Sequence, residues 1–364
     1  MANKTARLGD LATYINGYAF KPADWGDTGL PIIRIQDLTG NSYQLNRYDG
    51  GYPERIEVND GDVLISWSAS LGVYVWQRGK ALLNQHIFKV VFDKLPVNKD
   101  YFVFAVEHKL AEMESKTHGA TMKHIVKKDF DGTTIPYPPI EKQAEIADHL
   151  RRITSLIDRQ TEQLLLLDQL VKSRFIELFG TIHDNRFGFS VVTLQDVSAP
   201  IKDGTHQTPI YTTDAENGYK FLSSKDVTTG KVDWSHLKYI PEELHRELYA
   251  RISPRKGDIL LAKNGTTGIA AIVDRDEVFD IYVSLALIRP HGVDSTYLWA
   301  AINAAETKQQ FDASLKGIGV PNLHLGEIKK AHIILPPMEL QEQFAAFVEQ
   351  TDKSKLCGKM EVAA

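Results

Sequence analysis

Short apolar runs, each bounded by glycine, aspartate or asparagine, recur along the whole chain. Such runs predict short β-strands, because buried strands are apolar and turn residues end them. The expected strands are Pro31–Ile35, Asp62–Trp67, Gly72–Trp76 and Ile87–Phe92 in the first half, and Lys220–Leu222, Asp258–Lys263, Ile269–Val273 and Ile281–Ile288 in the second. Helical spacing of apolar positions predicts helices over Tyr101–Glu114 and Tyr297–Lys316. The pattern therefore predicts an α+β fold of mixed short strands and helices.

The order of these elements repeats once along the chain. Gly61-Asp62 precedes an apolar run and matches Gly257-Asp258, which lies 196 residues later. Pro138-Pro139 matches Pro336-Pro337, 198 residues later, and Leu8–Leu11 matches Leu194–Val197 near the start of each half. Chance matching of common turn patterns is the alternative. Three matches in the same order, at nearly one offset, favour a true internal repeat.

A long helix is predicted between the two halves. The segment Glu141–Phe179 contains neither proline nor glycine, follows Pro138-Pro139 and ends at Gly180. At about 1.5 Å per residue it would span about 58 Å. Apolar residues recur in it at alternating intervals of four and three, the pattern of a coiled-coil seam that needs a partner helix. The predicted seam residues are Ile146, Leu150, Ile153, Ile157, Leu164, Leu167, Val171 and Leu178.

A shorter partner helix is predicted after Pro336-Pro337. Phe344 and Val348 take the seam positions that Ile146 and Leu150 occupy in the first helix. The polar residues Thr351 and Lys355 occupy the next two positions, and Gly358 follows. We therefore expect the second helix to be roughly half as long as the first.

Composition and charge are those of an ordinary globular protein. A chain of 364 residues is longer than one hydrophobic core usually accommodates, so its length favours two domains. The formal net charge of −5 excludes a uniformly basic surface but permits local basic patches. The single cysteine, Cys357, excludes a disulfide framework and a cysteine-based zinc site. Because the sequence shows neither a signal-peptide core nor a membrane-length apolar run, we expect a cytoplasmic protein that does not enter membranes.

Catalytic and metal-binding motifs are absent from the sequence. It contains no nucleophile elbow, P-loop or zinc-protease motif, and its twelve histidines are scattered without ligand spacing. Asp60, Asp62 and Asp258 are conceivable magnesium ligands, but their place at Gly-Asp turns before strands is more simply turn chemistry. We therefore expect no catalytic residue, no metal site and no enzyme activity in this chain.

Three kinds of polar segment are candidates for contact with DNA. The basic run Lys116–Lys128 and its counterpart Lys316–His324 can neutralise phosphates. The segments Ser66–Gly72, Ala262–Gly268 and Lys202–Pro209 offer donors to phosphates and base edges. Ordinary solvated loops and hairpin turns are the alternative for each. The expected DNA-contacting residues are Lys21, Ser66, Ser68, Ser70, Lys116, His118, Thr121, Lys123, His124, Lys202, Thr205, His206, Lys263, Asn264, Thr266, Thr267, Lys316, Asn322 and His324.

The openings of the two halves resemble those of a known family. Ile15–Pro22, followed by Gly29–Leu38, is similar to one common opening of a target recognition domain in the specificity subunits of type I restriction–modification enzymes. Ile201–Pro209 is similar to the other common opening. The entry to the long helix, Pro138–Ile146, and its exit, Phe175–Gly180, resemble the central spacer of the same family. The resemblance covers nearly the whole chain.

This resemblance implies a non-catalytic subunit with target recognition domains at residues 1–140 and 181–336. Spacer helices at residues 141–180 and 337–364 would form an antiparallel pair. In this family each recognition domain reads one half of a bipartite, asymmetric site in double-stranded DNA. The implied partners are two methyltransferase subunits and ATP-dependent restriction subunits. S-adenosylmethionine, ATP and Mg²⁺ would bind those partners, and no cofactor is expected in this chain.

The short second helix departs from the family, whose members continue it much further. It implies either weaker docking of one methyltransferase subunit or a helix supplied by another chain. A truncated or silent copy of a specificity subunit is an alternative, as is a coiled-coil scaffold without DNA-reading activity. A self-sufficient nuclease or methyltransferase is disfavoured, because the sequence carries no catalytic motif.

Overall fold

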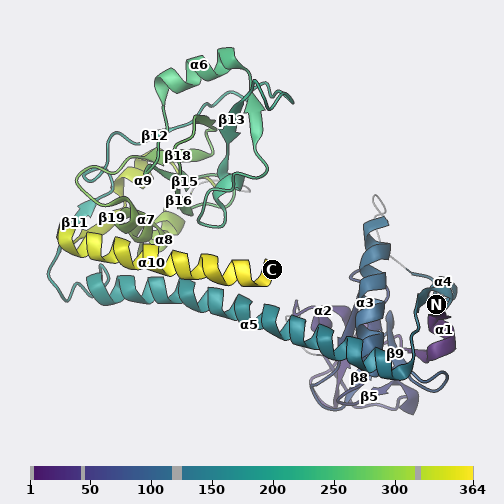
Figure 1. The fold of residues 1–364 in the computed structure, drawn as a ribbon. Helices are drawn as coiled ribbons and strands as arrows, with labels where there is room; N and C mark the ends of the chain where they lie inside the picture. The colour runs from purple at the N-terminus through teal and green to yellow at the C-terminus, as the bar shows by residue number, and fades with distance from the viewer. Residues whose placement is uncertain (1–3, 42–45, 117–124, 316–320, 364) are drawn as a thin grey trace. The chain divides into compact units, whose positions relative to one another are not determined.

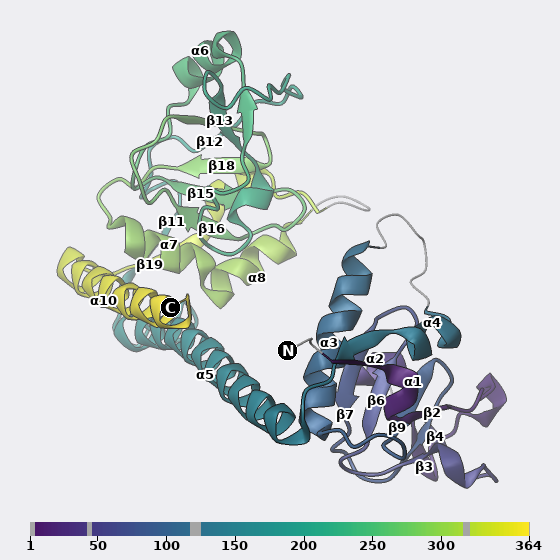
Figure 2. The same cartoon turned by 45° about the vertical axis from the view of Figure 1, so that its right-hand side comes forward.

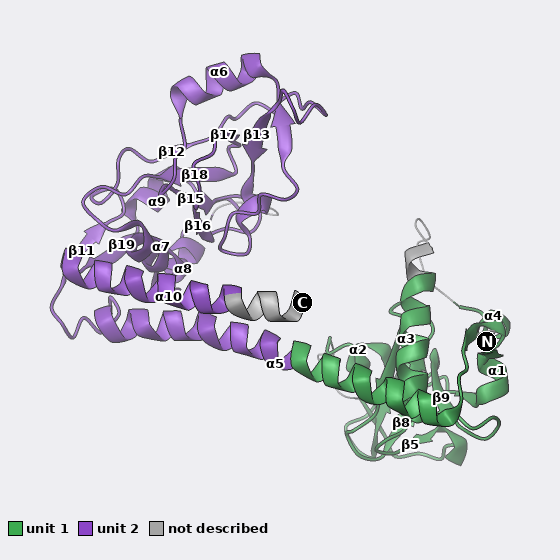
Figure 3. Cartoon of the chain, viewed as in Figure 1, with its two compact units in different colours: residues 1–157 green, residues 158–364 purple. Residues whose placement is uncertain are grey.

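In a computed structural model the chain divides into two compact units, residues 1–157 (unit 1) and 158–364 (unit 2) (Figure 3). The structure describes residues 4–41, 46–116, 125–315 and 321–363. Each unit contains short strands and helices, and the long helix α5 (Ile140–Phe179) begins in unit 1 and ends in unit 2 (Figure 1). No helix in the described part of the chain combines the length and apolar character that a membrane crossing needs.

Unit 1 is built on two four-stranded sheets and one strand pair. The first sheet has the order β2 (Thr13–Asn16), β9 (Ile87–Val91), β6 (Val63–Ser66), β7 (Gly72–Val75), and the second has the order β4 (Arg47–Tyr48), β3 (Leu30–Ile33), β8 (Ala81–Leu83), β5 (Glu57–Val58). The pair joins β1 (Thr5–Arg7) to β10 (Thr134–Pro136). The helical elements are α1 (Leu8–Leu11), η1 (Pro22–Asp24), α2 (Ile35–Leu38), η2 (Glu54–Ile56), α3 (Lys99–Lys116) and α4 (Lys127–Gly132).

Unit 2 has the same plan. Its first sheet has the order β12 (Lys202–Asp203), β18 (Leu285–Ile288), β15 (Ile259–Ala262), β16 (Ala270–Ile272), and its second has the order β14 (Lys238–Ile240), β13 (Tyr219–Leu222), β17 (Phe279–Ile281). The strand pair is β11 (Ser190–Thr193) with β19 (His332–Leu335). The helical elements are η3 (Ser224–Val227), α6 (Glu242–Arg251), α7 (Ser295–Asn303), α8 (Ala305–Ala313), α9 (Leu325–Lys330) and α10 (Met338–Ala363) (Figures 1 and 2).

The two units therefore repeat one topology, as the sequence repeat predicts. The order β2-β9-β6-β7 matches β12-β18-β15-β16, and the parallel pair β3–β8 matches the parallel pair β13–β17. The Gly-Asp turns precede the equivalent strands β6 and β15. Sequence similarity between the halves thus reflects a shared chain path.

Continuous apolar runs form the central strands because both faces of these strands are buried. Along β6, Val63 and Ile65 join one core cluster, whereas Leu64 joins the cluster on the other side. In β15, Ile259 and Leu260 are divided between two clusters in the same way. Successive side chains of a strand point to opposite faces, so a strand covered on both faces shows no polar alternation.

Two predicted elements prove to be interrupted. The expected strand Ile281–Ile288 is the end of β17 and the whole of β18, because a turn at Tyr282 redirects the chain, with the Leu285 amide donating to the Tyr282 carbonyl (2.9 Å). The expected helix Tyr297–Lys316 is the two helices α7 and α8, because Ala304 between them is extended (φ −64°, ψ 148°). Lys316 lies outside the described residues.

The predicted long helix agrees with α5 to within one residue at its start. Its partner α10 contains 26 residues against 40 in α5 and continues through Gly358, so it is longer than the half-length that the sequence suggested. In unit 2 the helices are antiparallel: Phe344, early in α10, packs on Phe179, whereas Lys355, later in α10, pairs with the earlier Asp168 (2.6 Å). Both views show α10 beside this part of α5 (Figures 1 and 2).

Candidate DNA interface

Three of the polar segments singled out in the sequence meet in unit 2. Asn264, after β15, forms an antiparallel bridge with Asn322. The amide of Gly265 donates to the Pro321 carbonyl (3.2 Å), and the amide of Leu323 donates to the Lys263 carbonyl (2.7 Å). The loop that follows β15 is therefore joined by its backbone to the segment that precedes α9.

Lys263 connects this meeting point to the third segment, Lys202–Pro209. Its side chain is 8% exposed, and its Nζ donates to Oδ2 of Asp203 at 2.7 Å. The exposed ring of His206 lies 3.4 Å from the same Asp203 oxygen. The pattern brings together side chains that are about 60 residues apart in sequence.

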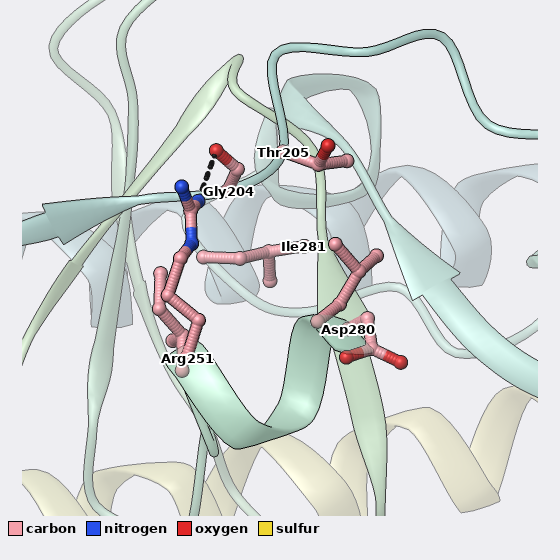
Figure 4. Close-up of a pocket in the computed structure, with 7 residues that line it drawn as sticks. Gly204, Thr205, Arg251, Asp280 and Ile281 are labelled. Atoms are coloured by element: carbon pink, nitrogen blue, oxygen red, sulfur yellow. Dashed lines mark hydrogen bonds between the residues drawn. The ribbon is translucent and has the colours of Figure 1, made fainter. Parts of the chain in front are cut away.

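The segment Lys202–Pro209 is fixed at its start by a close backbone approach. A Cβ atom on Gly204 would lie 2.0 Å from the carbonyl oxygen of Ile281, so only glycine fits. Arg251, at the end of α6, donates from Nη2 to the carbonyls of Asp203 and Gly204 at 2.7 Å each. Figure 4 shows the bond to Gly204. The Thr205 amide donates to the Ile281 carbonyl (3.2 Å), after which the chain emerges at His206.

The predicted contact residues of unit 2 fall into exposed and buried groups. Lys202, His206, Thr266 and His324 are exposed, and Lys202 Nζ donates to the Arg251 carbonyl (3.1 Å). Asn264 and Asn322 are half-buried. Thr205, Lys263 and Thr267 are buried. Lys316 lies outside the described residues.

Unit 1 repeats the arrangement with different side chains. The amide of Ile125 donates to the carbonyl of Trp67 (3.0 Å), as that of Leu323 does to Lys263. Gly17 corresponds to Gly204, because its Cβ would lie 2.0 Å from the Asn84 carbonyl oxygen. The Trp67 ring stacks on Phe88 at 5.4 Å, where unit 2 has an ion pair.

Among the predicted contact residues of unit 1, Lys21 and Ser70 are exposed. Ser66 and Ser68 are buried, and the Ser66 hydroxyl donates to the Ser70 carbonyl at 2.6 Å. Ser66 therefore shapes the loop from inside. Lys116 ends α3, and its side chain is not described. The remaining predictions, His118, Thr121, Lys123 and His124, lie outside the described residues.

Asp203 and Arg251, which hold the Lys202–Pro209 segment in place, are not among the predicted contact residues. Asp203 has a local signal, since it directly precedes the glycine that both halves share as Gly17 and Gly204. Arg251 has none, because it reaches its partners from the end of α6, at a place in the chain where unit 1 has the short helix η2.

A buried histidine–aspartate pair lies close to this region, between α6 and β17. His245 Nδ1 is 2.7 Å from Asp280 Oδ2, and the His245 ring stacks on Tyr219 at a centroid distance of 3.7 Å. Burial raises the pKa of Asp280, and the contact with His245 opposes that rise. Within the described residues, no group of three or more histidine, cysteine, aspartate or glutamate side chains is arranged to hold a metal ion.

The predicted seam is covered along part of its length. Val171, Phe344 and Val348 are buried in one cluster, with Leu178 packed against it. Leu164 and Leu167 are half-buried, as are Ile146 and Leu150 in unit 1, whereas Ile153 (52%) and Ile157 (45%) are exposed. Phe175 and Phe179 were not predicted, yet both rings contact Phe344, at 5.5 and 5.6 Å.

Comparison with known proteins identifies the family. A profile described as the type I restriction modification DNA specificity domain matches residues 2–167 and 188–358. The EcoBI specificity subunit of Escherichia coli is 27% identical, over 94% of this chain and 78% of that protein. The MjaVIII specificity subunit of Methanocaldococcus jannaschii is 26% identical, over 96% of this chain and 86% of that protein.

Solved structures show the same fold. The type I restriction–modification S subunit from M. genitalium superimposes with a TM-score of 0.55 at 14% identity, covering 99% of this chain and 92% of that chain. A chain from a study of type I complex assembly gives the same TM-score at 17% identity. The profile matches both halves of the repeat, and the relatives align along nearly the whole chain. The chain therefore belongs to the family of type I restriction–modification DNA specificity subunits.

Proposed function

We propose that this chain reads a bipartite, asymmetric site in double-stranded DNA, with one half-site for each recognition domain. The observation that carries the proposal is the repeated meeting of loops, centred on Trp67 in unit 1 and on Lys263 in unit 2. Equivalent backbone paths support the two meeting points, but their side chains differ. Sequence readout needs donors, acceptors and apolar groups at base edges, so unlike side chains on like scaffolds would read unlike half-sites.

The recognition domains we propose are residues 1–140 and 181–336, with spacer helices at residues 141–180 and 337–364. Contacts with DNA would come from the exposed members of the loops. In unit 2 these are Lys202, His206, Thr266 and His324, with the half-buried Asn264 and Asn322 beside them; in unit 1 they include Lys21 and Ser70. Lysine and histidine would position the protein on phosphates, whereas amides and hydroxyls suit base edges.

The spacer also offers a surface for the partner subunits. On α5, the large apolar side chains of Leu165 (59%), Leu166 (54%), Leu170 (48%) and Ile176 (50%) are exposed, although Val171 between them is buried under α10. An apolar face on a helix that already has one partner is typical of a site for further helices. We assign it to the two methyltransferase subunits. Restriction subunits would then join, and the partners would bind S-adenosylmethionine, ATP and Mg²⁺ in the cytoplasm.

Mapping of methylated bases tests this function. The chain is co-expressed with its methyltransferase subunit in cells free of other modification systems, and methylated positions are determined across the genome. We expect a motif of two unlike half-sites separated by a fixed spacer, present only when this chain is expressed. A palindromic motif, or methylation that persists without the chain, would contradict the proposal.

A matched pair of variants then assigns one half-site. Exchange of His206, Gln207 and Thr208 for alanine should relax the half-site read by unit 2 and leave the other unchanged, because these residues are exposed in that unit. Exchange of the exposed Lys225 for alanine serves as the control and should change neither half.

A further inference from the structure

In unit 2, Lys263 and Arg251 hold Asp203 from different elements, and we call these three residues the ionic clamp. The Asp203 carboxylate is 13% exposed and accepts a hydrogen bond from Lys263 Nζ (2.7 Å). Arg251 binds the carbonyls of Asp203 and Gly204, one residue apart, with the same Nη2 atom (2.7 Å each). The side chain and the backbone of Asp203 are thus held from different elements, by the residue after β15 and by the end of α6.

The Lys263 ammonium binds Asp203 and is shielded from solvent. Its side chain is 8% exposed and its Nζ points to Asp203. A lysine contacts phosphate only where the DNA backbone can reach its ammonium group. The exposed Lys202 meets this condition, whereas the buried Lys263 does not. The backbone of Lys263 is also engaged, since its amide donates to Ser284 (2.9 Å) and its carbonyl accepts from Leu323 (2.7 Å).

An exposed segment leaves the clamp immediately afterwards. His206, Gln207 and Thr208 are exposed, and beyond the buried Pro209 the side chain of Ile210 is 79% exposed. Tyr211 follows at 41%, with Lys238 Nζ 4.2 Å from its ring centroid. The segment offers imidazole, amide, hydroxyl and methyl groups, which are the chemical types that base edges in the major groove discriminate.

We propose that Lys263 and Arg251 are positioning residues, which clamp Asp203 and Gly204 and so fix the pose of His206–Tyr211, the segment that reads the half-site of unit 2. The inference rests on the proposed function and names the recognition segment within it. Lys263 then acts on DNA through Asp203 and touches neither phosphate nor base. Ile210 and Tyr211 join the candidate contacts of this half-site.

Unit 1 does without this ionic clamp. Trp67 takes the place of Lys263 and stacks on Phe88, and Asn16 takes the place of Asp203 before the shared glycine. A variant that removes the charge of Lys263 should therefore weaken recognition of the half-site of unit 2 only. This asymmetry supplies an internal control for correct folding and assembly.

The test measures binding of the chain, in complex with its methyltransferase subunits, to the duplex found by methylation mapping. Competing duplexes carry one changed base pair in either half-site, and salt is varied from about 50 to about 200 mM. For Lys263→Met we expect discrimination in the half-site of unit 2 to fall about tenfold or more, which corresponds to loss of one well-placed base contact. Discrimination in the other half-site and the slope of log affinity against log salt should stay as in the unaltered complex.

A direct phosphate contact predicts the opposite pattern. The slope would then fall by about 0.9, and discrimination in both half-sites would be retained; this result overturns the inference and leaves the proposed function intact. If the unaltered complex discriminates in neither half-site, the proposed function and the inference both fail.

A second variant separates positioning from misfolding. Lys263→Met alone leaves the Asp203 carboxylate without its cation, whereas the double variant Asp203→Asn/Lys263→Met removes both charges and is expected to fold. It should lose discrimination in the same half-site, because the clamp is absent. Full discrimination in the double variant would refute the proposal. Lys256→Met, at an exposed lysine of the same unit, is the matched control and should behave like the unaltered chain.

Discussion

Replacement of Phe344 by alanine should release α10 from α5. Phe344 is 0% exposed, and its ring centroid lies 5.5 Å from that of Phe175 and 5.6 Å from that of Phe179. Removal of a buried phenylalanine side chain costs about 3–5 kcal/mol. Each 1.4 kcal/mol is about a factor of ten, so local opening of α10 should become about a hundredfold to a few thousandfold more frequent.

Hydrogen–deuterium exchange of the α10 amides measures this opening directly. Phe344→Leu should fall in between, because it keeps most of the volume but loses two aromatic contacts worth about 0.5–1.5 kcal/mol each. Leu356→Ala, on the same helix at 60% exposure, should change the opening free energy by no more than about 0.5 kcal/mol. Unchanged protection of α10 in Phe344→Ala would refute the view that this aromatic contact holds the two helices together.

Three further predictions concern unit 2. Arg289→Met should destabilise it by about 3–5 kcal/mol, because the buried Asp258 loses two hydrogen bonds of 2.8 and 2.7 Å. In thermal melts, adding Asp258→Asn should restore part of the lost melting temperature, and an unchanged melting temperature in Arg289→Met would contradict the reasoning. Gly204→Ala should abolish recognition of the half-site of unit 2, since its Cβ would meet the Ile281 carbonyl at 2.0 Å, whereas the control Gly326→Ala, with open space around its Cβ, should bind DNA normally. Equal DNA binding by the two variants would be the adverse result. Burial alone would lower the pKa of Lys355, but its bonds to Asp168 and Asp352 raise it overall. The stabilisation it contributes is therefore fully present below the unfolded pKa of about 10.4 and is lost as pH rises through the folded pKa, so melts at increasing alkaline pH should show a loss that Lys355→Met lacks.

Much of the fold follows from local pattern. The strands β6 and β9 and the helix α5 were predicted to within one or two residues, because continuous apolar runs and long stretches free of glycine and proline are local signals. The repeat added the equivalence of the two units. It also showed that the openings of the halves differ, which the structure places around Gly17 and Gly204.

The meeting of the loops was beyond the reach of such signals. Lys263 and Asp203 are 60 residues apart, and only the pairing of β12, β18 and β15 in one sheet brings them together. A lysine after a strand looks the same in sequence whether it faces solvent or a carboxylate. The sequence therefore predicts a DNA contact at Lys263, which stays a prediction, and offers no signal for Arg251, whose partners are backbone carbonyls.

The strand pairs that begin and end each repeat have a consequence for how such proteins change. Thr5 lies opposite Pro136 in the pair β1–β10, and Ser190 lies opposite Leu335 in β11–β19. Paired strands are about 4.8 Å apart, so each module leaves the chain close to where it entered. A module whose ends are adjacent can be exchanged as a unit. Recombination at these strands would replace the module that reads one half of the recognised sequence and would leave the spacer helices unchanged. New combinations of half-sites would then arise by shuffling existing modules, without new point mutations in the loops.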